Sequence, residues 1–147
     1  MMIPHGTYIL ALDGRQMLLF RNKGDVRQPV LATILHERAE NHRSSVQGSD
    51  RPGRSFSSLG SRRSAMSGAD LHEEAEKSFV ARAAKNLEKA VHGKDARLIV
   101  LAAPSALGEI RKHIAAKLKD SIVAEIDRDV VNKPADDIVS VIDAFER

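Results

Sequence analysis

The sequence predicts an α/β fold: a single mixed β-sheet, antiparallel in its N-terminal part and parallel in its C-terminal part, packed by helices. Two observations favour this class. Short alternating apolar segments joined by turn residues occupy the first quarter of the chain. Beyond residue 68, helical periodicities alternate with short apolar runs, which is typical of strand–helix–strand units. We expect one domain over residues 1–147, with a basic Ser/Gly/Arg-rich loop at about 40–69.

Three strands are predicted at the start of the chain. Side chains of Thr7–Asp13 are expected to alternate between the two faces of a strand, and Asp13-Gly14 suits a type I′ turn that needs positive φ. Gln16–Phe20 then reads as the returning strand. A second turn at Asn22–Asp25 leads to a third strand at about Val30–His36, which completes an antiparallel meander. The residues of the first strand expected to share one face are Tyr8, Leu10 and Leu12.

A long helix is predicted after the basic loop. Asp70 has the properties of an N-cap, with Glu73 three residues later as its capping-box partner. The helix should run to about His92, where Gly93 supplies a left-handed C-terminal residue. The apolar stripe of this helix comprises Leu71, Ala75, Phe79, Ala83, Leu87 and Ala90, at spacings of three and four.

The rest of the chain predicts a parallel strand–helix–strand unit and a final helix. Leu98–Ala102 is a continuous apolar run, typical of a central strand covered on both faces. Pro104 can begin the next helix, and residues 122–126 form another alternating strand. The unit from 96 to 127 should be a right-handed crossover. Pro134 opens the last helix. The buried positions expected in the two helical segments are Leu107, Ile110, Ile114, Leu118, Ile138, Val141, Ile142 and Phe145.

Composition excludes several classes of function. The chain has no Cys, so disulfides, thiolate catalysis and Cys-ligated zinc are excluded, and no cofactor is expected. Aromatic residues make up only 3%, which argues against a base-stacking platform. The start of the chain lacks the pattern of a signal peptide, and no run approaches the roughly 20 apolar residues of a membrane span. We therefore expect a cytoplasmic protein without a membrane partner.

The positive charge is concentrated in the loop. The formal net charge is only +3, but residues 41–67 contain five arginines against a single acid, Asp50. The C-terminal region 120–147 is acidic by comparison. This distribution makes the loop, rather than the whole surface, the candidate for contact with an anionic partner.

Several short motifs resemble a known family. These are Arg51-Pro-Gly-Arg-Ser-Phe, Asp70-x-His72-Glu73, Val123-Ala-Glu-Ile-Asp-Arg-Asp and the following Lys133-Pro134. Together they are similar to the bacterial "protein required for attachment to host cells" family, over nearly the whole chain. That family in turn resembles the middle domain of eukaryotic and archaeal peptide-chain release factors, which has a strand meander, a long exposed loop and a long helix before strand–helix–strand–helix.

The resemblance implies a specific role for the loop. In those release factors the loop carries a Gly-Gly-Gln that enters the ribosomal peptidyl transferase centre. Here Ser61, Arg62 and Arg63 stand as the loop equivalent of that tripeptide, ahead of Ser64-Ala65, and Gly-Gly-Gln itself is absent. Release by that chemistry is therefore not expected. Without the other domains of those factors, stop-codon reading is not expected either, and a host-attachment role would be indirect.

The loop arginines are the first candidate site. We expect Arg51, Arg54, Arg62 and Arg63 to contact phosphates, because the guanidinium fork binds such oxygens in pairs. Phe56, the only aromatic residue of the loop, could anchor it or stack on a base. Ribosomal or other structured RNA is the partner that this chemistry and the resemblance indicate. The alternative is a solvated insertion that binds nothing.

The start of the long helix is the second candidate site. His72 and Glu76 lie four residues apart on one helical face and could share a metal, but the second His of the zincin pattern is missing. Asp70 and Glu73 are already explained by capping. We therefore expect no metal, and His72 is the candidate catalytic residue if the protein is an enzyme.

The third candidate is a set of acidic residues at strand ends, Asp13, Asp127 and Asp129. Such carboxylates can bind a cation or act as bases. Turn formation and solubility are the favoured explanation, since Asp is common in turns. No Ser-His-Asp spacing or nucleophile elbow is present.

The sequence favours a non-enzymatic host-attachment family protein that acts as a cytosolic RNA- or ribosome-associated module. Two alternatives stay open. One is a hydrolase that acts on a phosphorylated or nucleic-acid substrate through the loop and His72. The other is a protein-interaction domain whose loop orders on binding. Edge strands of the meander could also pair between subunits in a homo-oligomer.

Overall fold

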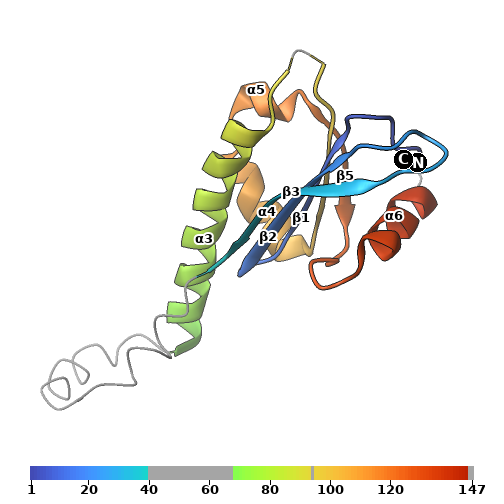
Figure 1. Ribbon diagram of the computed structural model, residues 1–147. Helices are drawn as coiled ribbons and strands as arrows, with labels where there is room; N and C mark the ends of the chain where they lie inside the picture. Colours follow the sequence, from blue (N-terminus) through green and yellow to red (C-terminus); the bar gives the residue numbers. More distant parts are fainter. Residues whose placement is uncertain (40–67, 94, 146–147) are drawn as a thin grey trace, which may run out of the picture.

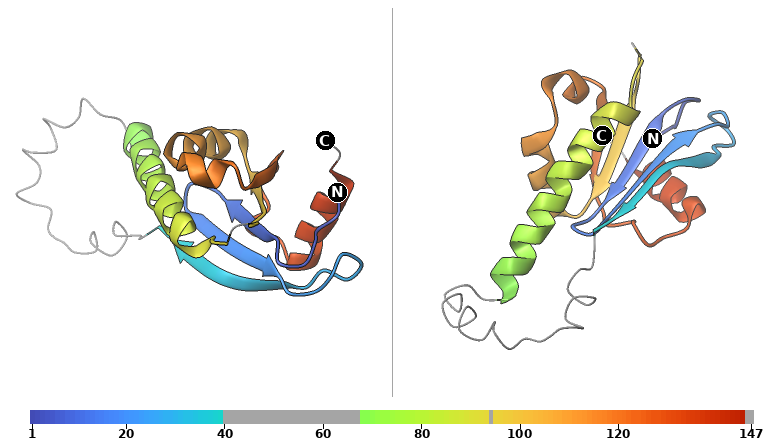
Figure 2. Two further views of the ribbon diagram at one scale, coloured as in Figure 1. Left: turned by 90° about the horizontal axis from the view of Figure 1, so that it is seen from above. Right: turned by 60° about the vertical axis from the view of Figure 1, so that its left-hand side comes forward.

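The structure is a computed structural model that describes residues 1–39, 68–93 and 95–145. It contains a five-stranded mixed sheet in the order β3-β2-β1-β4-β5, with helices on both faces (Figures 1 and 2). The predicted α/β class is confirmed. The strands are β1 (Tyr8–Leu12), β2 (Gln16–Asn22), β3 (Leu31–Arg38), β4 (Leu98–Ala102) and β5 (Ile122–Asp127). The helices in the described residues are α3 (Gly68–Ala90), α4 (Pro104–His113), α5 (Ala116–Lys119) and α6 (Ala135–Ala144).

The sheet is antiparallel on one side of β1 and parallel on the other. β1 pairs antiparallel with β2, and β2 pairs antiparallel with β3. β1 also pairs parallel with β4, which pairs parallel with β5. The predicted meander and the parallel arrangement of the later unit are therefore both confirmed. Every residue of β1 and β4 is buried, because helices cover both faces of these central strands.

Two hydrophobic clusters lie on the two faces of the sheet. Tyr8, Leu10 and Leu12 share one face, as predicted, and pack with the buried side chains of α3 and α4. The intervening Ile9 and Ala11 face the other cluster, which contains Ile138 and Ile142 of α6. The alternation of β1 thus divides a wholly apolar strand between two cores.

α3 is longer than its buried stripe. Phe79, Ala83 and Leu87 are buried as predicted, but Leu71 is 57% exposed and Ala75 is also exposed. The helix has 23 residues, a length of about 35 Å at the usual rise, whereas the strands have five to eight. Its first turns project past the sheet (Figure 1), so the prediction that Leu71 and Ala75 pack in the core is wrong.

The predicted cap of α3 is also wrong. The helix begins at Gly68, so Asp70 lies inside the first turn and not at the N-cap. Its carboxylate is still well placed, because negative charge near a helix N-terminus is stabilising. At the other end α3 stops at Ala90, earlier than the predicted His92, while Gly93 has the predicted positive φ, 118°, a value that side chains disfavour.

The turn between β1 and β2 is not type I′. Among the described glycines only Gly6 and Gly93 have positive φ, so Gly14 does not. Instead, Oδ1 of Asp13 accepts hydrogen bonds from the backbone N–H groups of Arg15 (2.7 Å) and Gln16 (2.6 Å), which forms an Asx turn. The glycine is required for a different reason: a Cβ at Gly14 would lie 2.7 Å from the side chain of Glu76 in α3.

The remaining boundaries differ modestly from the predictions. β2 extends to Asn22, and β3 covers Leu31–Arg38 instead of 30–36. The helical segment after β4 is divided into α4 and α5 at Ile114–Ala115, although its four predicted core positions are all buried. None of the described helices has the length and apolar character needed to cross a membrane.

Each edge strand of the sheet, β3 and β5, contains a β-bulge. Leu19 pairs with Leu35 and Phe20 with Thr33, which leaves Ile34 as an extra residue in β3. Val123 is the corresponding extra residue in β5. Such bulges disfavour continued pairing with another sheet. Association between subunits therefore stays a prediction from the sequence.

Candidate functional site

The end of β3 and the start of α3 lie at one end of the sheet. They flank the basic loop predicted at about 40–69, which is called the basic segment from here on. The registers place the end of β3 beside the start of β2 and the end of β1, so this is the edge where the parallel strands end. α3 begins beyond the same edge (Figure 1). In open α/β sheets this edge is where ligands commonly bind. All the predicted site residues of the basic loop lie outside the described residues; these are Arg51, Arg54, Phe56, Ser61, Arg62 and Arg63.

The predicted residues at the start of α3 are all exposed. His72, Glu73 and Glu76 occupy the projecting turns. Nothing among the described residues hydrogen-bonds to His72 or pairs with it, so no described group orients it as a base. Within the described ranges, no group of three His, Asp or Glu side chains is arranged to hold a metal ion.

The strand-end carboxylates are mostly engaged in local turns. Asp13 holds the turn between β1 and β2 through its Oδ1. Oδ1 of Asp129 accepts a hydrogen bond from the backbone N–H of Val131 at 3.3 Å. Asp127 is exposed at the end of β5. The turn interpretation therefore explains Asp13 and Asp129 without a catalytic role.

A groove that no sequence motif indicated lies between β3 and α3, beside the flanks of the basic segment. Its volume is about 640 Å³. Nδ2 of Asn86 donates to both carboxylate oxygens of Glu37 (2.9 and 3.0 Å), which ties α3 to β3. Arg82 lies over the ring of Phe79, 5.9 Å from its centroid. Arg38 also lines the groove. Neither arginine makes an ion pair with another described residue, so both remain available to an anionic ligand.

This groove was hard to foresee because its halves are distant in the chain. Glu37 and Asn86 are separated by 49 residues and carry no shared motif. Arg38 and Arg82 are single arginines among ordinary charged neighbours. Only the packing of α3 across β2 and β3 brings them together.

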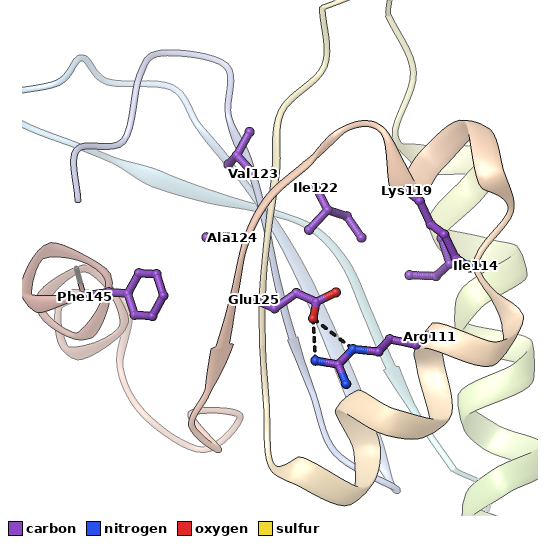
Figure 3. Close-up of a pocket in the computed structure, with 8 residues that line it drawn as sticks. All are labelled: Arg111, Ile114, Lys119, Ile122, Val123, Ala124, Glu125 and Phe145. Carbon is purple, nitrogen blue, oxygen red and sulfur yellow. Dashed lines mark hydrogen bonds and ion pairs between the residues drawn. The ribbon is translucent and has the colours of Figure 1, made fainter. Parts of the chain in front are cut away.

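A second groove runs along the outer edge of β5 (Figure 3), with a volume of about 570 Å³. Nε and Nη2 of Arg111 donate to Oε1 of Glu125 at 2.9 and 2.6 Å. This hydrogen bond raises the pKa of Arg111, and the carboxylate's charge acts in the same direction. Phe145 lines the opposite side. A charged pair over an exposed edge strand is a common protection against aggregation, so we assign this groove a structural role.

Gly14→Ala is expected to move the projecting part of α3 and to lower the free energy of unfolding by about 1–3 kcal/mol, since overpacking costs this much. The added Cβ would approach Cβ of Glu76 to 2.9 Å, so a flexible side chain cannot absorb the whole clash. Gly108→Ala in α4 is the control, because a Cβ there meets nothing within 4 Å. It should stabilise by about 0.5–1 kcal/mol through helix propensity. Urea denaturation measures both changes, and equal midpoints for the two variants would contradict the assignment.

These features define the class of the protein. It is an α/β domain of the release-factor-like type, with an antiparallel three-stranded half, a basic segment before a projecting long helix, and a parallel second half. The sequence profile described as "Bacterial archaeo-eukaryotic release factor family 12" matches residues 6–142, and the chain belongs to this family. The predicted relationship to release factors is confirmed. No curated protein matches the chain.

Proposed function

We propose that the protein is a cytosolic, non-enzymatic module that binds ribosomal or other structured RNA through its basic segment. The observation that carries this proposal is the position of that segment. Five arginines lie between β3 and the projecting start of α3, in a chain that belongs to a release-factor family. A release-factor family points to partners in translation, and RNA is the partner whose phosphates suit arginine.

Arg54, Arg62 and Arg63 carry the phosphate contacts in this proposal. Arg38 and Arg82 lie beside the flanks of the segment, and neither is paired with a described residue. They place two further guanidinium groups in the groove between β3 and α3. A backbone phosphate there would meet a guanidinium group without first breaking an ion pair within the described fold.

Peptide release is not part of the proposal. The chain contains no Gly-Gly-Gln, and Arg63 occupies the place that the resemblance assigns to the glutamine. The protein would therefore occupy or sense the ribosome, and its tripeptide equivalent would not release the nascent peptide. A host-attachment phenotype would follow indirectly, from altered translation.

The test is co-sedimentation of the wild-type protein with ribosomes over a series of salt concentrations. We expect the logarithm of the association constant to fall linearly with the logarithm of salt, with a slope of magnitude about three or more. Nuclease treatment of the ribosomes should abolish co-sedimentation of the protein. Binding that survives nuclease and ignores salt would indicate a protein partner and reject the RNA proposal.

A further inference from the structure

A separate polar pocket lies at the opposite end of the sheet from the basic segment. It has a volume of about 410 Å³ and is formed where β1 and β4 begin and the chain leaves α3. Figure 1 shows α3 running from one end of the molecule to the other, so the two regions are far apart. We call it the amino-edge pocket. Its polar side chains belong to His5, Thr7, Tyr8, Arg21, His92, Asp95 and Arg97.

The hydroxyl of Thr7 is the first indication of a ligand. Thr7 is 1% exposed, and its Oγ1 has no hydrogen-bond partner, the one such buried side-chain atom among the described residues. The backbone of Thr7 is satisfied, since its N–H donates to Pro4 O (3.2 Å) and its carbonyl accepts from the N–H of Asn22 (2.9 Å). A buried hydroxyl without a partner is uncommon and costly, and a bound group can supply the missing partner.

Arg21 is held in a fixed position at the pocket. Its guanidinium lies over the ring of Tyr8, 4.9 Å from the centroid, and its Nε donates to the carbonyl of Gly6 at 3.3 Å. No described carboxylate pairs with it. The terminal nitrogens of a guanidinium fixed in this way keep their donors for another acceptor.

The other side of the pocket is also cationic. Arg97 makes no ion pair with a described residue, and Asp95 is the only acidic side chain in the lining, without a described cation within ion-pair distance. Nδ1 of His5 is hydrogen-bonded to the carbonyl of Gly24 at 2.7 Å, which holds the imidazole in place. The lining therefore offers two guanidinium groups that no described carboxylate pairs with, and a spare hydroxyl.

Two glycines form part of the wall of the pocket. Gly6 and Gly93 both line it, and they are the two described glycines with positive φ, at 84° and 118°. A Cβ at Gly93 would meet nothing within 4 Å, so this exposed residue borders open space. A Cβ at Gly6 would lie 3.7 Å from Nη2 of Arg21, in van der Waals contact with that group.

We propose that the amino-edge pocket binds a phosphate group. Arg21 and Arg97 contact its oxygens through their planar forks, and the hydroxyl of Thr7 donates to a third oxygen. The phosphate belongs either to a free mononucleotide or to an RNA strand, because the pocket recognises the group that both share. This site is independent of the basic segment and does not rest on the function proposed above.

The experiment is an NMR titration with inorganic phosphate at constant ionic strength. The amide signals of Gly6, Thr7 and Gly93 are expected to shift and to saturate by about 10 mM, which corresponds to a dissociation constant near 1 mM. Arg21→Gln should weaken binding at least about tenfold, because a charge-assisted hydrogen bond is removed, and Thr7→Val about fivefold. Arg128→Gln, an exposed arginine between β5 and α6, is the matched control and should leave the affinity unchanged.

Two further arms distinguish the source of the phosphate. If adenosine monophosphate binds more tightly than phosphate and an RNA oligonucleotide does not compete, the natural ligand is a free nucleotide. Competition by the oligonucleotide supports an RNA strand. Phosphate binding should persist when Arg54, Arg62 and Arg63 are replaced, so a failure of ribosome association would not affect this test.

Thr7→Val also provides a control for folding. The substitution keeps the shape of the side chain and removes an unpaired buried hydroxyl, so the melting temperature without phosphate should be equal to or higher than that of the wild type. Loss of binding then reflects the hydroxyl and not unfolding. Unsaturable shifts, equal shifts with chloride, or an unchanged affinity in Thr7→Val would overturn the proposal.

Discussion

Asn22→Ala is expected to lower the free energy of unfolding by about 3 kcal/mol, because several backbone groups lose their partner at once. Asn22 is fully buried at the end of β2. Its Oδ1 accepts from the N–H groups of Gly24 (2.8 Å) and Val30 (2.9 Å). Its Nδ2 donates to the carbonyl of Ile3 at 2.9 Å, with longer contacts to Pro4 and Asp25.

This one amide therefore joins the N-terminal segment to the β2–β3 turn. The measurement is thermal or urea unfolding, where the loss corresponds to a fall of roughly 10 °C in melting temperature. Lys23→Ala is the control, since Lys23 is the exposed neighbour of Asn22 and should change stability by less than about 0.5 kcal/mol. If Asn22→Ala also changes the free energy of unfolding by less than about 0.5 kcal/mol, water replaces the amide without cost and the prediction is wrong.

Replacing Arg54, Arg62 and Arg63 together with glutamine is expected to reduce affinity for ribosomes by roughly 100- to 1,000-fold at about 0.1 M salt, since each neutralised phosphate releases a condensed counterion. The salt slope should fall in magnitude by about three, one for each arginine that no longer neutralises a phosphate. Co-sedimentation across the salt series measures both quantities. The melting temperature of the triple variant, compared with that of the wild type, is the folding control.

The matched control replaces the same three arginines with lysine. Lysine keeps the charge but lacks the planar fork, so the salt slope should stay close to that of the wild type while affinity falls modestly. A triple glutamine variant that binds like the wild type would place the contacts elsewhere, and Arg38 and Arg82 in the groove would be the next positions to replace.

The fold was largely predictable because each element has a local signature. The short apolar segments at 8–12 and 98–102 predict strands, and neighbouring residues alone produce these patterns. Gly93 has the predicted positive φ, because glycine tolerates this conformation for local reasons, although α3 already ends at Ala90. The relationship to release factors could likewise be predicted, because it rests on short motifs in the chain.

The errors arose where distant segments compete with local preference. Asp13-Gly14 is a good type I′ pair, but α3 packs against this turn, and Gly14 is needed for the space beside Glu76. Leu71 fits the helical stripe, yet the sheet ends before it and leaves the side chain exposed. In both cases the local pattern is present in the sequence, but the packing of distant segments decides the outcome.

The sequence by itself determined the class of the fold, the order of its elements and the concentration of arginine before α3, because these depend on residues close together in the chain. Only the tertiary structure decided which side chains meet. Arg38 reaches the groove that Arg82 lines because α3 crosses the sheet. Thr7 joins Arg21 and Arg97 in the amino-edge pocket because three separate segments begin or end there. A spare hydroxyl or an unpaired guanidinium is recognisable only after every other partner in the fold has been placed.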